Sequence, residues 1–253
     1  MSARDDINSL YNASNNYATL NSYLFIANLI ASIVSIFLMG TAQEVLLCIQ
    51  IIFAVVYIMV ELIDDGILWF RAERARRKNS MQNAFATRFS ELDTDGYYNN
   101  SLNPSLMKYA LNQFESNFFT KNISEKMLAK SILKSVLAVI VLIIAARYVH
   151  NGDIILVITQ TVFSATVVED TVRLVIYVFR MKKIYDEAYT EFITVGITRE
   201  SQKVWLLSYS TEYEAIKSYY KIRLDSKIFR KMNPELSVQW ESLKESIQCN
   251  DND

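Results

Sequence analysis

Residues 24–39 of the chain read LFIANLIASIVSIFLM, and this apolar stretch decides the fold. Its only polar members are Asn28, Ser32 and Ser35. With one residue added at each end, it approaches the roughly 20 residues that a helix needs to cross a bilayer. A short break at 40–44 separates it from a second apolar run at 45–60, which continues toward Phe70. Two apolar runs joined by a short break predict a helical hairpin that crosses a membrane twice.

A second pair of apolar runs follows later in the chain. Residues 132–146 read ILKSVLAVIVLIIAA, and after a break at 149–153 the fourth run extends from Ile154 to about Phe179. Each run could instead be a buried helix of a large soluble protein. The third run is the weakest candidate for a membrane span, because Lys134 interrupts it. However, four runs in 253 residues leave too little polar chain to bury them. We therefore expect an all-α integral membrane protein, with four transmembrane helices in two hairpins plus cytoplasmic helical regions.

The composition agrees with a helical membrane protein. The chain is 51% hydrophobic and has a mean hydropathy of +0.12. It contains only five Gly and two Pro, so few positions force a helix to end. Its 26 basic and 27 acidic side chains give a net charge of −1, which argues against DNA or RNA binding driven by overall basicity.

The charges that flank the apolar runs predict the orientation. Basic side chains follow the second and fourth runs and precede the third, whereas the two breaks carry few. By the positive-inside rule, the breaks face outward and both termini lie in the cytoplasm of a multi-pass protein of the cell membrane. The expected divisions are an N-terminal segment at 1–22, a hairpin at 23–70, a helical region at 71–130, a second hairpin at 131–180 and a C-terminal helical region at 181–253.

Local signals predict where the cytoplasmic helices begin and end. The helix after the second run is expected to continue to about Leu92. Ser124 can cap a helix that runs on into the third apolar run, and Gly196 is expected to end the helix that follows the fourth. A further helix is then expected from about Thr198 to Met232, with a last one opened by Asn233-Pro234.

The informative residues are the polar ones inside the apolar runs, because an ionisable side chain in a bilayer is costly unless it faces a partner or water. In both the second and the fourth run such residues recur at helical spacing, so each set lies on one face that should avoid lipid. The second run supplies Gln50, Tyr57, Glu61 and Asp64, and the fourth supplies Thr159, Thr166, Asp170 and Arg173.

Two interpretations of these polar faces remain open. Glu61 and Asp170 lie near the inner end of their spans, where they could form an acidic ring of a cation-selective pore assembled from several subunits. Alternatively, Asp170 pairs with Arg173 along its own helix, while Glu61 and Asp64 reach the headgroup level.

A second candidate site combines a basic run with aromatic side chains in the cytoplasmic region. Guanidinium groups beside exposed aromatic rings are suited to bind a nucleotide, because they provide bidentate hydrogen bonds and a stacking surface. The simpler interpretation is a topology signal that also contacts anionic lipid. The residues concerned are Arg74, Arg76, Arg77, Lys78, Tyr97, Tyr98, Phe118, Phe119 and Lys121.

The sequence contains no recognisable catalytic set. Its single histidine, His150, has no neighbouring ligands, and no Gly-rich phosphate-binding loop follows a predicted strand. We therefore expect no enzyme activity, no metal and no resident cofactor.

The layout resembles that of the four-span pore-forming effectors of bacterial antiphage systems. The resemblance rests on the paired spans and on three short stretches, Met81-Gln-Asn-Ala-Phe-Ala-Thr87, Tyr97-Tyr-Asn-Asn100 and Glu115-Ser-Asn-Phe-Phe-Thr-Lys121. It implies a homo-oligomer that permeabilises or depolarises the bacterial inner membrane in abortive infection, triggered by a cyclic oligonucleotide second messenger. A non-conducting membrane-anchored interaction protein and a constitutive small ion channel are the alternatives.

Overall fold

The structure, a computed structural model, describes residues 6–35, 37–92, 98, 100–148, 154–197 and 200–247. The elements in these ranges are all helices, so the all-α prediction is confirmed for the described part of the chain. They are α1 (Asp6–Ser35), α2 (Thr41–Ile63), the π-helical turn η1 (Asp64–Leu68), α3 (Trp69–Phe85), α4 (Leu106–Tyr148), α5 (Ile154–Tyr189), the π-helical turn η2 (Thr190–Val195), α6 (Glu200–Tyr220) and α7 (Ser226–Glu245).

Three stretches of helix are long and apolar enough to cross a membrane: Asp6–Ser35, Thr41–Phe85 and Leu106–Ile144. They cover residues 24–35 of the first predicted apolar run, all of the second, and residues 132–144 of the third. The fourth predicted span begins at Ile154 in α5, and its side chains from 154 to 164 lie outside the described part of the structure. The predicted break at 149–153 lies outside it as well.

The chain divides into two compact units. The hairpin unit comprises Tyr11–Phe70 and Leu128–Val172, and so combines parts of both predicted hairpins. The aromatic unit comprises Met1–Leu10, Arg71–Met127 and Arg173–Asp253, as far as these stretches are described. Helices α4 and α5 contribute residues to both units.

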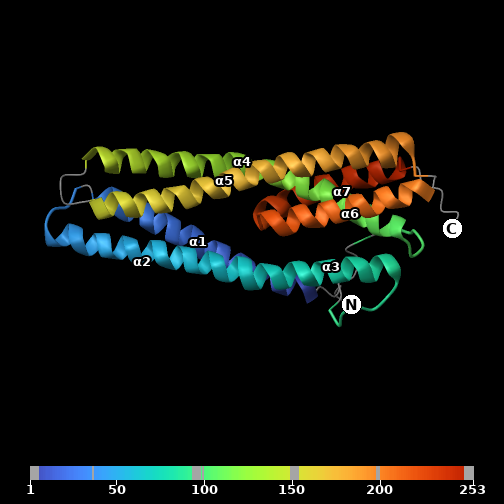
Figure 1. Cartoon of the computed structure of the whole chain (residues 1–253), viewed down its shortest axis with the longest axis horizontal. Helices are drawn as coiled ribbons and strands as arrows, with labels where there is room; N and C mark the ends of the chain where they lie inside the picture. The colour runs from blue at the N-terminus through green and yellow to red at the C-terminus, as the bar shows by residue number, and fades with distance from the viewer. Residues whose placement is uncertain are drawn as a thin grey trace. The chain divides into compact units, whose positions relative to one another are not determined.

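The hairpin unit is a bundle formed by α1, α2, α4 and α5 (Figure 1). One buried side chain from each helix forms its central layer: Phe25, Tyr57, Ala138 and Val167. The outward-facing positions carry large apolar side chains, such as Leu62, which is 63% exposed, and Leu133, which is 60% exposed. A bundle that exposes such side chains on its surface is typical of helices surrounded by lipid.

The aromatic unit is built around Phe114 of α4. Its ring lies 5.4 Å from that of Tyr185 in α5, 5.1 Å from Phe192 in η2 and 5.5 Å from Trp240 in α7. Trp205 of α6 extends the cluster, with its ring 5.9 Å from that of Phe192. The contacts of these rings therefore hold α4, α5, α6 and α7 together in one core.

Helix ends differ from the predictions in α3 and α4. Ser124 caps no helix, since α4 runs continuously through it and its hydroxyl donates to the carbonyl of Lys121 within the helix. Helix α3 ends at Phe85 instead of near Leu92. By contrast, Gly196, with a φ of 76°, follows the last residue of η2, and the helix ends there as predicted.

The last two helices also divide at another point than predicted. Helix α6 ends at Tyr220, and α7 begins at Ser226 under an N-cap supplied by Asp225. Asn233-Pro234 does not open a helix, because Pro234 lies inside α7. The Asp225 carboxylate accepts hydrogen bonds from the backbone N–H groups of Lys227 and Ile228, as an N-cap residue does. The sequence prediction had placed the start of the last helix at Asn233-Pro234 instead.

Candidate functional site

Charged side chains lie in the hairpin unit one helical turn from its central layer. Lys134 is one turn from Ala138, Glu61 one turn from Tyr57, and Asp170 one turn from Val167. The Lys134 ammonium lies 4.4 Å from the centre of the Phe25 ring and 5.9 Å from that of Tyr57. Both carboxylates act electrostatically on this ammonium, and the Tyr57 hydroxyl donates to Asp170. We call Lys134, Glu61, Asp170 and Tyr57 the charged cluster.

The charged cluster joins three of the sequence-predicted residues to one that the sequence did not single out. Glu61 and Asp170 were interpreted either as an acidic ring that lines a passage between subunits or as groups that pair along a helix or reach the headgroups, and Tyr57 was placed on the same polar face as Glu61. In the structure they gather around Lys134 inside a single chain, with Tyr57 only 3% exposed. Lys134 was interpreted as an interruption of an apolar run and as one of the basic residues that set the orientation, because its neighbours on α1, α2 and α5 cannot be known before the helices are packed.

Gln50 and Asp64 also point into the hairpin unit. Gln50 is fully buried, and its side-chain amide donates to the carbonyl of Ala31 at 3.2 Å and accepts from the Ser32 hydroxyl at 3.3 Å. Asp64 is 5% exposed and accepts a hydrogen bond of 2.5 Å from the hydroxyl of Ser14. These bonds join α1 to α2 and η1, which contain the polar residues predicted to share one face.

A hydroxyl group that the sequence analysis missed joins the other pair of helices. Thr171 of α5 shares hydrogen bonds of 2.7 Å with Ser131 and 2.6 Å with Ser135, both of α4. A serine at each of two positions one turn apart, facing a threonine, is the only sequence signal for this contact. Such bonds strengthen helix pairs in lipid modestly, by roughly 0.6 kcal/mol each.

The other predicted residues of the fourth run are less informative. Thr166 is half-buried in α5, and Arg173 falls within the aromatic unit instead of the hairpin unit. The side chain of Thr159 lies outside the described residues. Asn28, by contrast, is fully buried, and neither polar atom of its side chain finds a hydrogen-bond partner within the described chain.

The basic run and its aromatic neighbours do not form the open surface expected for a nucleotide. Arg76 and Tyr98 are 5% and 7% exposed, and Phe118 is buried at 6%, so the expectation that these rings are exposed was wrong. Arg74 remains exposed, Arg77 donates to the hydroxyl of Ser218, and Lys78 is half-buried. Lys121 lies 4.2 Å from the centre of the Tyr185 ring, and Tyr97 lies outside the described residues.

Arg76 belongs to a buried network that joins α3 to α6. Its guanidinium donates to Glu73 at 2.9 Å and to Glu214 at 2.6 Å, and the Lys217 ammonium lies 3.2 Å from the second carboxylate oxygen of Glu73. Burial and the charge of Arg76 lower the pKa of Lys217, whereas the two carboxylates raise it. Two cations and two anions therefore balance within this network, which we call the α3–α6 network.

A second titratable group lies between α4 and α7. Burial raises the pKa of Glu115 to about 7, with Lys244 lowering it and Glu241 raising it further. Lys244 is itself paired with Glu241 at 2.6 Å, so its charge only partly offsets the burial of Glu115. This carboxyl group therefore gains or loses its proton near neutral pH.

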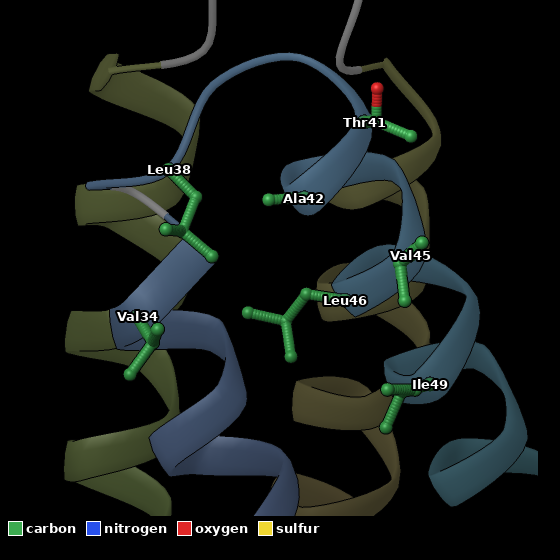
Figure 2. Close-up of a pocket in the computed structure, with 7 residues that line it drawn as sticks. All are labelled: Val34, Leu38, Thr41, Ala42, Val45, Leu46 and Ile49. Atoms are coloured by element: carbon green, nitrogen blue, oxygen red, sulfur yellow. The ribbon is translucent and has the colours of Figure 1, made fainter.

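An apolar hollow of about 420 Å³ lies where α1 connects to α2. Figure 2 shows Val34 and Leu38 facing Ala42 and Leu46 across it, with the Thr41 hydroxyl at its rim. A lining of this kind offers no group for acid–base chemistry, so the hollow suits only an apolar occupant such as an acyl chain.

Metal ligands do not cluster within the described chain: no three His, Cys, Asp or Glu side chains there could share an ion. Cys48 is exposed and is a free cysteine. No family model matches the sequence, and no match was found among curated proteins or among solved structures.

Proposed function

We propose that this chain is an integral membrane protein that permeabilises a membrane when a ligand or partner rearranges its helices. The observation that carries the proposal is the charged cluster: ionisable side chains inside a bundle whose outer surface is apolar. Charges inside a membrane bundle are costly and usually mark a pathway for ions or protons.

The exposed apolar surface supports insertion into a bilayer. In the most apolar 18-residue stretch of Leu106–Ile144, only 11% is buried inside the structure. In the corresponding stretch of Thr41–Phe85, 22% is buried. Soluble helices of this length bury their apolar face against protein. With a fourth span in α5, two hairpins cross the membrane, and both termini lie in the cytoplasm because the flanking basic residues do.

The interior polar groups favour a conducting protein over a passive anchor. An anchor needs only apolar packing between its spans, whereas this bundle contains Lys134, Glu61, Asp170 and the fully buried amides of Gln50 and Asn28. Separation of the helices would expose these groups to water, which they prefer to lipid. The same residues that hold the bundle closed would then line the opening, in one subunit or in a homo-oligomer.

The aromatic unit is the part suited to respond to a signal. It shares α4 and α5 with the hairpin unit, so a rearrangement of its core alters the helices that contain Lys134 and Asp170. The resemblance to antiphage effectors supports a cyclic oligonucleotide as the trigger and the bacterial inner membrane as the target, and thus a role in abortive infection.

Membrane potential in cells tests this function. Expression together with a nucleotide cyclase that activates it should depolarise the inner membrane, while expression alone should not. Glu61→Gln and Asp170→Asn should weaken the response at unchanged protein level, because each removes a charge from the opening. Glu44→Gln is the control, since Glu44 is an exposed acid in the first turn of α2.

The competing function is a non-conducting interaction protein. The closed packing of Phe25, Tyr57, Ala138 and Val167 within one chain favours it, because a passage through this layer requires the helices to move. An unchanged potential under all conditions, with the protein located in the membrane fraction, would replace our proposal by this one. Depolarisation without any trigger would instead indicate a constitutive channel.

A further inference from the structure

We infer that the basic segment 221–231, which connects α6 to α7 and begins α7, docks onto the anionic phospholipid headgroups of the bilayer. This inference rests on the membrane insertion proposed above and adds a second, peripheral contact with the same membrane. The segment was not among the basic residues that the sequence analysis considered for lipid or nucleotide.

The segment carries an excess of positive charge. Its only acid, Asp225, accepts hydrogen bonds from two backbone N–H groups as the N-cap of α7. The start of α7 adds the positive end of a helix dipole at the same place. The exposed cations of the segment are Lys221, Lys227, Arg230 and Lys231, and Arg223 is half-buried.

Contacts within the aromatic unit place this segment beside the ends of two apolar runs. The backbone N–H of Asp225 donates to the sulfur of Met127 at 3.5 Å, and Met127 lies five residues before the third apolar run begins. The ring of Tyr220 lies 6.1 Å from that of Tyr177 and 5.8 Å from the Arg180 guanidinium, near the end of the fourth run. Five helical residues span only about 7.5 Å, so the segment lies at headgroup depth if these runs cross a bilayer.

The cations of α7 face away from the core of the aromatic unit. Arg230 and Lys231 follow Lys227 by three and four residues, so all three lie on one face of the helix, and all three are exposed. Leu236 and Trp240, at 3% and 2% exposed, lie on the opposite face. The packing that buries Trp240 therefore presents the cations outward.

A bilayer surface fits this arrangement better than a single soluble phosphate does. The cations are spread along a linker and a helix face instead of converging on one point, and a plane of headgroups offers many negative charges to such a surface. Tyr219, next to the segment, is 77% exposed, and tyrosine is favoured at the membrane–water interface.

The test uses the full chain with Cys48→Ser and Cys249→Ser, labelled through Ser226→Cys with an environment-sensitive dye. Position 226 is exposed and adjoins the cations. The protein is inserted in vesicles of phosphatidylcholine with or without phosphatidylglycerol, some of whose lipids carry a headgroup quencher. We expect stronger quenching with phosphatidylglycerol than without it, and loss of this difference at high salt.

The decisive variant is the pair Lys227→Gln and Lys231→Gln, which leaves in place Arg230, whose Nε donates to the Ser226 carbonyl. Loss of two basic side chains should lower the ratio of docked to undocked segment by up to about thirty-fold. The control pair is Arg88→Gln and Lys203→Gln, both exposed and remote in sequence from the segment. It should leave quenching unchanged.

Three outcomes would overturn the inference. They are equal quenching on both vesicle types, equal effects of the two variant pairs, and displacement of the labelled segment by added inorganic phosphate. Extraction with alkaline carbonate separates this failure from that of the proposed function. A protein that resists extraction but shows no lipid-dependent quenching refutes only the docking, whereas an extractable protein refutes membrane insertion.

Discussion

Replacing Lys134 by Met removes the positive charge of the charged cluster while keeping a side chain of similar length. Glu61 and Asp170 then keep their negative charges beside the buried Tyr57 without the ammonium that acts on them. The two carboxylates repel each other and favour water over the bundle interior. We expect Lys134→Met to open the hairpin unit without any trigger.

The size of the effect follows from the contacts of the ammonium. Leaving buried charges without an opposite charge costs about 3–5 kcal/mol, and the low end applies because Lys134, Glu61 and Asp170 are only half-buried. The interaction of its ammonium with the Phe25 ring, at 4.4 Å, adds about 1 kcal/mol, and apolar packing of the Met side chain offsets a similar amount. The closed state should therefore lose about 3 kcal/mol, which changes its population relative to the open state by about 150-fold.

The assay is potassium efflux from vesicles that contain the purified variant and no ligand. Lys130→Met is the matched control, because Lys130 lies one turn away on α4 and is exposed. Lys134→Met should leak and the control should not, and adding Glu61→Gln with Asp170→Asn should close the leak again. A Lys134→Met protein as tight and as stable as the parent would refute the role assigned to the charged cluster.

The remaining predictions concern stability in detergent micelles, measured by chemical unfolding. Glu115→Gln should stabilise the protein at pH 8 and change its stability little at pH 5. The pKa of the Glu115 carboxyl is about 7 in the folded protein and lower in the unfolded chain, so the folded protein loses up to about 3 kcal/mol of stability as the pH rises between those values. Equal effects at both pH values would contradict this. Arg76→Met should cost about 3–5 kcal/mol by leaving the buried Glu73 and the half-buried Glu214 with one cation, whereas the exposed Arg74→Met should stay within about 0.5 kcal/mol. Similar losses for both would be inconsistent with the α3–α6 network. Thr171→Val should cost about 1 kcal/mol, since its hydroxyl bonds two serines of α4, and no loss would mean that these bonds contribute nothing.

The sequence was sufficient to predict the helical class and most residues of the first three apolar runs as helix, because both depend on local composition. Gly196 likewise marks a helix end through its own backbone freedom, here with a φ of 76°. The caps at Ser124 and Asn233 were wrong for a related reason. A residue suited to cap a helix does so only where the helix would otherwise begin or end. Helices α4 and α7 are continuous at these positions, because tertiary packing favours the longer helix.

The candidate site was only partly accessible from the sequence. Helical spacing correctly grouped Gln50, Tyr57 and Asp64 on a face that is now seen to be buried. Lys134 could not be assigned to the same cluster, since its partners come from other helices. Tyr98 and Phe118 were expected to be exposed, yet burial of their rings depends on which helices pack against them.

Release of a small dye from liposomes tests the central claim most directly. The purified protein is inserted in liposomes and measured alone and with a panel of cyclic di- and trinucleotides, with Lys134→Met as a ligand-independent positive control. We expect the unmodified protein to be silent alone and to release dye with one nucleotide. No release under any condition from correctly inserted protein, Lys134→Met included, would contradict a permeabilising function.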